Sequence, residues 1–334
     1  MTRAEFRSTL QRWCLEDGGA NAGVEGLKRD LEFLERELFH EYKVTSHGEH
    51  GSFGARLARW IGNLDNDADR KNLYLILAHL FFIGKSEQDA AYRTAYSKHV
   101  MQWLMDVSGI DPFQTNARTL LAQELASTRF TEVTDSFGIR DFCIINGIQS
   151  EALRYKWEGN IDGWDAADFR NNVLDEDVNG SLRRKNLVLL EDFVGSGSQM
   201  LDAVDLAVSL GPEVNVLLCP LFICPEGARE ANVRSSAIAH FSFSPVLSFE
   251  ERFFISPAYD TSEHPDFDRV RRLLVKIHPK LQGYPQEYGP FGYRETGGFI
   301  VPYTNCPDNS IPAVHKKIQN SWEPLFLRNS RLPT

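Results

Sequence analysis

The feature that most constrains the fold of this 334-residue chain is the segment 187–200, with the sequence LVLLEDFVGSGSQM. Its first four residues are all apolar, as expected of a strand that is covered on both faces of a sheet. Apolar residues then recur at helical spacing from Ser198 to Leu210. The segment therefore predicts a buried strand, a tight turn and a helix, which together form the repeating unit of a mainly parallel α/β sheet.

The turn of this segment carries the residue types that a phosphate group needs. Gly195 and Gly197 permit positive φ and the close approach of a ligand to the backbone. Ser196 and Ser198 add hydroxyl donors beside the backbone N–H groups, and the positive end of the following helix dipole adds further attraction for an anion. Since Gly/Ser turns also occur without a phosphate, the turn alone is a weak signal.

Two acidic residues, Glu191 and Asp192, precede the turn. Carboxylates accept hydrogen bonds from ribose hydroxyls but repel a phosphate placed against them. An acid pair beside a phosphate-binding turn therefore predicts a ribose-phosphate ligand. The structural alternative is that these acids only end the strand and cap the turn.

The segment 187–199 resembles the phosphoribosyl-pyrophosphate motif of type I phosphoribosyltransferases. That motif is a hydrophobic strand, two acids, two apolar residues and a loop of Thr or Ser and Gly. The sequence departs from it at Glu191, where the family usually has Asp, and at Ser196, which replaces Thr. It also has Gln199 where a Thr or Ser hydroxyl often helps to bind the 5′-phosphate.

The resemblance implies a type I phosphoribosyltransferase fold and a Mg²⁺ ion bridged by the ligand. Glu191 and Asp192 would hold the ribose hydroxyls and act in catalysis, while the 195–199 turn would bind the phosphate. A pyrophosphate loop is expected near 146–150. Since negative charge grows on the departing pyrophosphate, cations should lie between this loop and the motif strand. Lys156 and Arg183 are the predicted catalytic cations, and Arg170, Arg184 and Lys185 share the same interval.

Two C-terminal stretches, 297–312 and 322–328, resemble the ending of phosphoribosyltransferase-like proteins of bacterial conflict systems. That family occurs in retron-associated and other anti-phage loci, so the resemblance implies a defence role with protein partners such as a reverse transcriptase or another effector. Asn305 and Asn309 are candidate ligand-binding residues in a C-terminal hood, because amides read ring donors and acceptors. The alternative for both is turn formation around neighbouring prolines.

Composition and sequence pattern limit the kinds of partner that the chain can bind and the cell compartment in which we expect it. The net charge of −10 and the pI near 5.4 argue against a broad nucleic-acid-binding surface. The apolar stretch 73–83 is too short to cross a bilayer, and the N-terminus lacks the apolar core of a signal peptide. Since the five cysteines show no metal-ligand spacing, and His79, His240 and His278 have no matching partners in sequence, we expect no metal site of the protein's own. These features predict a cytoplasmic protein.

The chain is expected to form two domains. Residues 1–130 predict a helical bundle or cap, with helices over 27–38, 72–83 and 86–104, that is available for partner docking. Residues 131–334 predict the phosphoribosyltransferase-like domain and its C-terminal hood. Its expected strands are 142–148, 187–190, 214–223, 237–243 and 298–301.

Three other functions are alternatives to phosphoribosyl transfer. A P-loop NTPase is unlikely on the sequence because no Lys follows the second Gly of the turn. An S-adenosylmethionine-dependent methyltransferase stays open, although it normally needs an acid at the end of the next strand, where Pro225 precedes Glu226. A non-catalytic sensor of nucleotide metabolites, or a structural component of a defence complex, also stays open.

Overall fold

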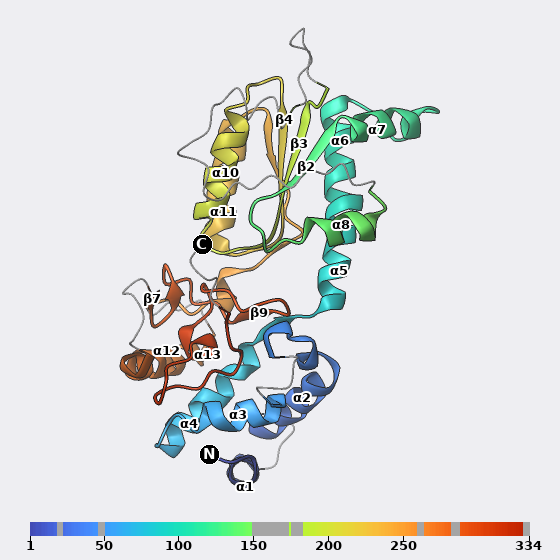
Figure 1. Cartoon of the computed structure of the whole chain (residues 1–334). Coiled ribbons are helices and arrows are strands. Elements are labelled where there is room, and N and C mark those ends of the chain that lie inside the picture. Colours follow the sequence, from blue (N-terminus) through green and yellow to red (C-terminus); the bar gives the residue numbers. More distant parts are fainter. Residues whose placement is uncertain are drawn as a thin grey trace. The chain divides into compact units, whose positions relative to one another are not determined.

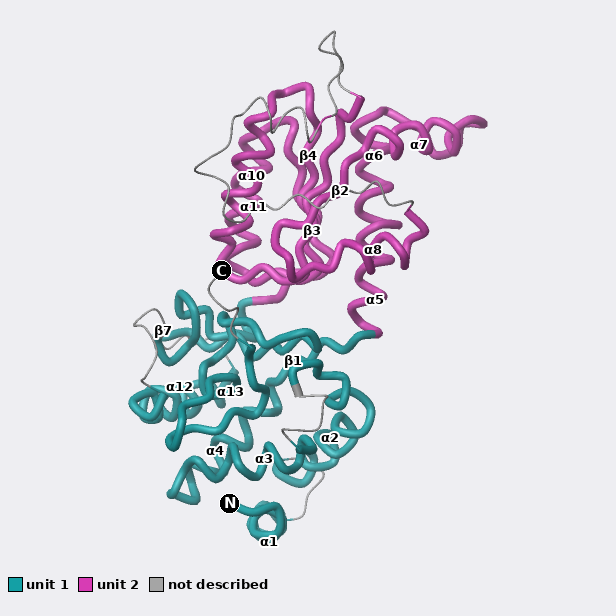
Figure 2. Tube along the Cα trace, viewed as in Figure 1, with its two compact units in different colours: residues 1–85, 251–334 teal, residues 86–250 magenta. Residues whose placement is uncertain are grey.

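The computed structural model describes residues 1–18, 23–45, 51–148, 174, 183–258, 264–281 and 288–329. The chain divides into two compact units (Figure 2). Unit 1 comprises residues 1–85 and 251–334, and unit 2 comprises residues 86–250. Unit 1 is therefore built from both ends of the chain, and the whole of unit 2 lies between its two halves in sequence.

Unit 2 is built on a parallel sheet. Its strands are β2 (Thr128–Glu132), β3 (Asn186–Val194), β4 (Asn215–Ile223), β5 (Phe241–Phe243) and β6 (Leu247–Ser248). The order is β2-β3-β4-β5, with β6 also paired to β4, and every pairing is parallel. The predicted mixed α/β class with a mainly parallel sheet is thus confirmed.

Helices cover both faces of this sheet (Figure 1). One face carries α10 (Ser198–Val208) and α11 (Pro225–Ala237). The other carries α5 (Lys85–Thr94), a π-helix (Ala95–Val100), α6 (Met101–Ser108) and α8 (Ile139–Asn146), and α7 (Ala117–Ala126) follows α6.

Both faces of the central strand β3 are buried. Leu187 and Leu189 pack in one cluster with Met200 of α10. On the edge strand β2, the ring of Phe130 lies 5.9 Å from that of Phe142 in α8. Burial on two faces is the physical reason that β3 opens with an uninterrupted apolar run instead of an alternating one.

Unit 1 is mainly helical. Its helices are α1 (Arg3–Glu16), α2 (Val24–Glu37), α3 (Phe53–Ile61), α4 (Asp67–Leu75), α12 (Phe267–Ile277) and α13 (Pro312–His315). A short parallel pair joins β1 (Phe81–Ile83) to β9 (Ile300–Pro302), and β7 (Tyr288–Gly289) pairs antiparallel with β8 (Gly292–Tyr293). The pairing of β1 with β9 links the two halves of the chain directly.

The core of unit 1 also joins the two ends of the chain. The buried ring of Phe326 lies 5.5 Å from that of Phe39 and 5.2 Å from that of Tyr42. The indole Nε1 of Trp60 donates a hydrogen bond to the carbonyl of Ala313 at 2.6 Å. The N-terminal helices therefore complete their core with the C-terminal segment, because they do not cover their own apolar faces.

The boundaries of the two units differ from those of the two predicted domains, which were expected to join at residue 130. Residues 86–130 pack in unit 2, because the run from α5 to α6 covers one face of the sheet and β2 forms its edge. Residues 251–329 pack in unit 1, so the predicted hood segment belongs to the mainly helical unit. The predicted strand 298–301 corresponds to β9, which pairs with β1 and not with the main sheet.

Two local predictions were wrong. The expected strand at 142–148 is the helix α8, in which Phe142 and Cys143 are buried while Ile144 is 66% exposed. The expected helix over 72–83 ends at Leu75, continues as a 3-10 helix and becomes β1. Both stretches are short apolar runs, for which burial alone does not distinguish helix from strand.

Candidate functional site

The acid pair lies within the motif strand itself. Strand β3 continues through Glu191 and Asp192 to Val194, so the strand is longer than the predicted 187–190. Because β2, β3 and β4 are parallel, their carboxyl ends meet at one edge of the sheet. In open α/β sheets this edge is where ligands bind.

The Glu191 side chain is held by the loop that follows β2, residues 133–138, which we call the β2–α8 loop. Its Oε2 accepts a hydrogen bond from the backbone N–H of Thr134 at 2.8 Å, and its Oε1 accepts one from the Thr134 hydroxyl at 2.6 Å. The Ser136 hydroxyl lies 3.4 Å from the same Oε1. Glu191 therefore fixes the β2–α8 loop against β3.

The Asp192 side chain shares the same loop with Glu191. Its Oδ1 accepts hydrogen bonds from the Ser136 hydroxyl and from the backbone N–H of Phe193, both at 2.8 Å. Asp192 is 7% exposed and Glu191 is 4% exposed. Two adjacent buried carboxyl groups and two hydroxyl groups are thus gathered in one cluster at the carboxyl edge of the sheet.

Burial governs the protonation of this acid pair. Burial raises the pKa of the Glu191 carboxyl well above its usual range, and the negative charge of Asp192 raises it further. Burial also raises the pKa of Asp192, against the hydrogen bond from Ser136 that lowers it. Because the two carboxyl groups are adjacent and buried, ionisation of one opposes ionisation of the other.

The Gly/Ser turn connects this pair to α10. Gly197 stands immediately before α10 and has φ +89°. Glycine adopts this left-handed conformation without steric cost. Gly195 has no positive φ, so the sequence prediction holds for the second glycine only. The hydroxyls of Ser196 and Ser198 lie 3.3 Å apart, Ser196 being buried.

Helix α11 packs closely on the same turn. A Cβ placed on Gly197 would lie 3.2 Å from the Cα of Gly227, and one placed on Gly227 would lie 2.8 Å from the carbonyl oxygen of Gly195. The turn is therefore held between the starts of α10 and α11. The first backbone N–H groups of a helix have no partner within the helix, and such groups commonly bind anions.

The sequence profile of the PRTase-CE family matches residues 57–328, which is more than half of the chain. The chain belongs to the PRTase-CE family. It is a phosphoribosyltransferase-like protein, and the matched range spans both units. A search of the curated proteins found no match to this PRTase-CE chain.

Sequence reasoning missed the β2–α8 loop of this PRTase-CE protein. Thr134 and Ser136 touch the acid pair, whereas the pyrophosphate loop was expected near 146–150. That expectation rested on a strand at 142–148, which is α8, so the strand that precedes β3 is β2. Thr128, Phe130 and Thr131 are the β-favourable residues in the sequence of β2 that could have located the loop.

The predicted cations are not placed at the acid pair. Lys156 and Arg170 lie outside the described residues. Arg183 is exposed and precedes β3, whose first residue is Asn186. Glu191 is five residues after Asn186 in β3. Since a strand rises ~3.3 Å per residue, the acid pair lies roughly 16 Å from the start of the strand. Arg183 is therefore at the opposite end of β3 from Glu191, and its role as a cation for the pyrophosphate stays a prediction.

The two predicted hood residues lie in unit 1, where the chain itself occupies their amides. The Nδ2 of Asn305 donates to the carbonyl of Asn329 at 3.0 Å, and its Oδ1 accepts from the Asn329 N–H at 3.2 Å. The Nδ2 of Asn309 donates to the Thr296 hydroxyl at 3.0 Å. These contacts favour the turn-forming alternative for both residues, and a hood over the ligand stays a prediction.

Proposed function

We propose that unit 2 binds phosphoribosyl pyrophosphate or a related ribose phosphate together with Mg²⁺. The observation that carries this proposal is the acid pair of β3 beside the Gly/Ser turn, at the carboxyl edge of a parallel sheet. Asp192, the more exposed of the two acids, accepts hydrogen bonds from the ribose hydroxyls. The 195–198 turn and the first N–H groups of α10 bind the 5′-phosphate.

The residues of the acid pair suit Mg²⁺. This ion prefers oxygen ligands and is commonly held by one or two carboxylates together with the phosphates of its substrate. The pair offers two carboxyl groups beside the hydroxyls of Thr134 and Ser136. When bound, Mg²⁺ supplies charge neutralisation for the pyrophosphate group.

In the transferase version of the proposal, an acceptor atom forms a bond to the anomeric carbon of the ribose while the bond from that carbon to pyrophosphate breaks. The leaving group takes the bonding electron pair as negative charge. Asp192 orients the ribose, and Glu191 holds the β2–α8 loop in place for it. Lys156 is the proposed cation for the pyrophosphate, and its segment lies outside the described residues.

The non-catalytic version of the proposal is a sensor of nucleotide metabolites. It is favoured by Gln199, which stands where the catalytic family often has a Thr or Ser hydroxyl. The two versions share one binding site and differ only in turnover. Release of pyrophosphate is therefore the measurement that separates them.

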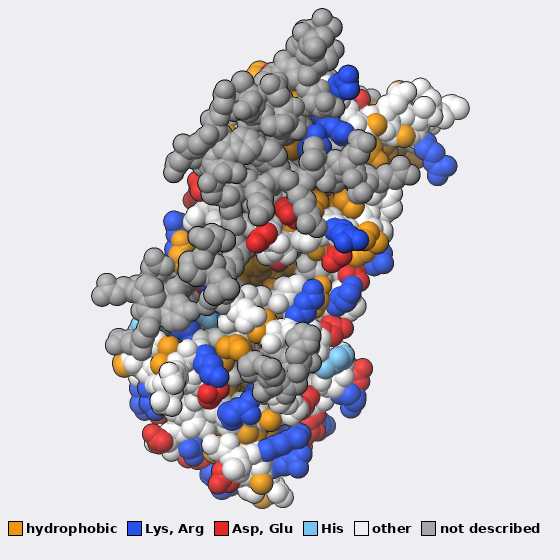
Figure 3. All heavy atoms as spheres, in the orientation of Figure 1, with side chains coloured by type: hydrophobic (Ala, Val, Ile, Leu, Met, Phe, Trp, Pro, Cys, Tyr) orange, Lys and Arg blue, Asp and Glu red, His pale blue; other side chains and the backbone are white. Residues whose placement is uncertain are grey.

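We also place the protein in a bacterial anti-phage system of the retron type, as an effector or component with protein partners. The support is the resemblance of its C-terminal stretches to proteins of such loci. Figure 3 shows basic side chains interspersed with acidic ones over unit 1, which together with the net charge of −10 favours a protein or small-molecule partner over a nucleic-acid backbone. None of the helices in the described ranges is long and apolar enough to cross a membrane.

The binding proposal is tested by calorimetry with phosphoribosyl pyrophosphate and Mg²⁺. We expect wild type to bind and Asp192→Asn to bind at least about tenfold more weakly, since hydrogen bonds to a charged group contribute about 1.5–3 kcal/mol. Asp202→Asn is the matched control, because it removes the same charge at an exposed position of α10. Absence of binding, or equal affinity in both variants, would refute the site.

Turnover and the cellular role need separate assays. Pyrophosphate release across a panel of nucleobase and nucleotide acceptors supports the transferase, and binding without release supports the sensor. Binding of S-adenosylmethionine in place of phosphoribosyl pyrophosphate would instead indicate a methyltransferase. For the defence role, cells that carry the chain with its neighbouring genes are challenged with phage, and Asp192→Asn is expected to remove protection that Asp202→Asn keeps.

A further inference from the structure

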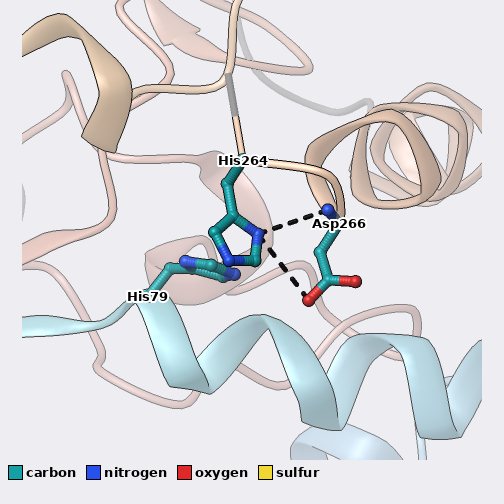
Figure 4. Close-up of side chains that lie close together, drawn as sticks. All are labelled: His79, His264 and Asp266. Carbon is teal, nitrogen blue, oxygen red and sulfur yellow. Dashed lines mark hydrogen bonds and ion pairs between the residues drawn. The ribbon is translucent and has the colours of Figure 1, made fainter. Parts of the chain in front are cut away.

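A second cluster of chemically active side chains lies in unit 1, apart from the acid pair in sequence and in fold. His79 ends the 3-10 helix that follows α4, while His264 and Asp266 directly precede α12. One nitrogen from each imidazole and one carboxylate oxygen lie within 4.8 Å of one another. Figure 4 shows the three side chains grouped at the start of α12, with the two rings facing each other edge to face.

His79 contributes a ring nitrogen that the protein does not use. Its Nε2 is buried and finds no hydrogen-bond partner among the described residues. Such an atom is costly, because burial removes its water and nothing replaces it. An imidazole nitrogen in this position can bind a metal ion.

His264 and Asp266 contact each other and Arg269. The backbone N–H of Asp266 donates to the Nδ1 of His264 at 3.2 Å, and the Oδ2 of Asp266 lies 3.8 Å from the same nitrogen. The other carboxylate oxygen, Oδ1, accepts from Arg269 at 3.0 Å. Arg269 therefore orients the carboxylate through Oδ1, while Oδ2 faces the imidazole.

The three side chains can form a tetrahedral metal site after a small movement. With bonds near 2.1 Å, the ligand atoms of such an ion are about 3.4 Å apart, so the distances of up to 4.8 Å between the three groups must shorten by up to about 1.4 Å. His264 and Asp266 have side-chain exposures of 49% and 44%, and exposed side chains can rotate at small cost. His79 is the fixed member, since its ring packs against His264 at 4.5 Å and against Phe267 at 4.8 Å.

We propose that His79, His264 and Asp266 form a Zn²⁺ site, with water as the fourth ligand. Two imidazoles and one carboxylate are a ligand set that zinc uses. The ion joins the segment after α4 to the start of α12, and so links the N-terminal half of unit 1 to its C-terminal half. The sequence did not predict this site, because 185 residues separate His79 from His264 and no local spacing connects them.

The test is Zn²⁺ binding by the full chain after removal of metal with a chelator. Calorimetry is expected to give one Zn²⁺ per wild-type chain, and Co²⁺ is expected to give visible absorption bands at the same stoichiometry. Zn²⁺ is also expected to raise the melting temperature, because it binds only the folded protein. His264→Gln is the principal variant, since its exposed position lets the chain fold, and it should weaken binding about tenfold or more.

His40→Gln is the matched control, because His40 is an exposed histidine of the same unit. It should bind Zn²⁺ as wild type does, and His79→Gln should bind as weakly as His264→Gln. Circular dichroism shows that each variant is folded before titration. The proposal fails if wild type does not bind Zn²⁺, or if His264→Gln and His40→Gln bind with equal affinity and equal thermal shift.

Discussion

The close packing of the Gly/Ser turn makes Gly197→Ala an informative substitution. Its left-handed backbone, φ +89°, costs a residue with a Cβ about 1–2 kcal/mol. The added Cβ would also lie 3.2 Å from both the Cα of Gly227 and the Cε of Met200, and overpacking of this kind typically costs about 1–3 kcal/mol. Together these terms predict a loss of roughly 2–5 kcal/mol in the stability of unit 2.

Two other glycines of unit 2 separate the terms. Gly109 has φ +63° with nothing within 4 Å of its would-be Cβ, so Gly109→Ala measures the backbone cost alone. Gly227 has no positive φ, but its Cβ would lie 2.8 Å from the carbonyl oxygen of Gly195, so Gly227→Ala measures crowding without the cost of a left-handed backbone. In a helix interior Ala gains up to about 1 kcal/mol over Gly, which offsets part of that crowding.

Scanning calorimetry of the full chain measures these differences. For a unit of this size, 1 kcal/mol shifts the melting temperature by about 2–4 °C, so Gly109→Ala should melt lower by a few degrees and Gly197→Ala by clearly more. Ligand binding should follow the same order, with Gly109→Ala unchanged and Gly197→Ala impaired. If Gly197→Ala melted no lower than Gly109→Ala, the claim that α11 confines the turn would be refuted.

Three further outcomes are expected. Because the pKa of Glu191 is raised in the folded protein, the folded state holds the proton more tightly, and stability is lost as pH rises from the ordinary carboxyl range through the raised pKa. Glu191→Gln should therefore gain stability relative to wild type between pH 5 and pH 8 in thermal melts, whereas a pH-independent difference would contradict a raised pKa. Ser136→Ala should weaken ribose-phosphate binding in calorimetry, because Ser136 positions Asp192; unchanged affinity would remove the β2–α8 loop from the site. Tyr42→Phe should cost unit 1 about 1–3 kcal/mol in urea unfolding, since its hydroxyl donates to Leu327 at 2.8 Å and accepts from the Cys306 N–H at 3.0 Å; a loss within measurement error would show that water replaces both bonds.

The arrangement of unit 1 bears on how the protein folds. Its N-terminal helices bury Phe39 and Tyr42 against Phe326, so the core of unit 1 closes only after the whole of unit 2 has been synthesised. Long-range contacts of this kind slow folding, because the ends of a long chain must meet before the contacts form. Removal of residues 1–130, the predicted docking domain, would cut through both units and would also leave the C-terminal segment without its partners.

What the sequence alone determined is the chemistry that depends on neighbours along the chain. The strand, acid pair, Gly/Ser turn and helix of 187–210 are encoded by local periodicity and by residue types with fixed conformational preferences, and all of them appear in the structure. The positive φ at Gly197 is of the same kind, since the turn requires it whatever packs around it.

What only the tertiary structure decided is the set of groups that meet across the chain. Thr134 and Ser136 reach the acid pair because β2 pairs with β3, and His79 reaches His264 because the two ends of the chain build one unit. Short apolar runs such as 142–148 were assigned wrongly, because their burial depends on which element covers them. Pairing and packing over long sequence separations follow from closure of the core, and no local pattern of residues records that closure.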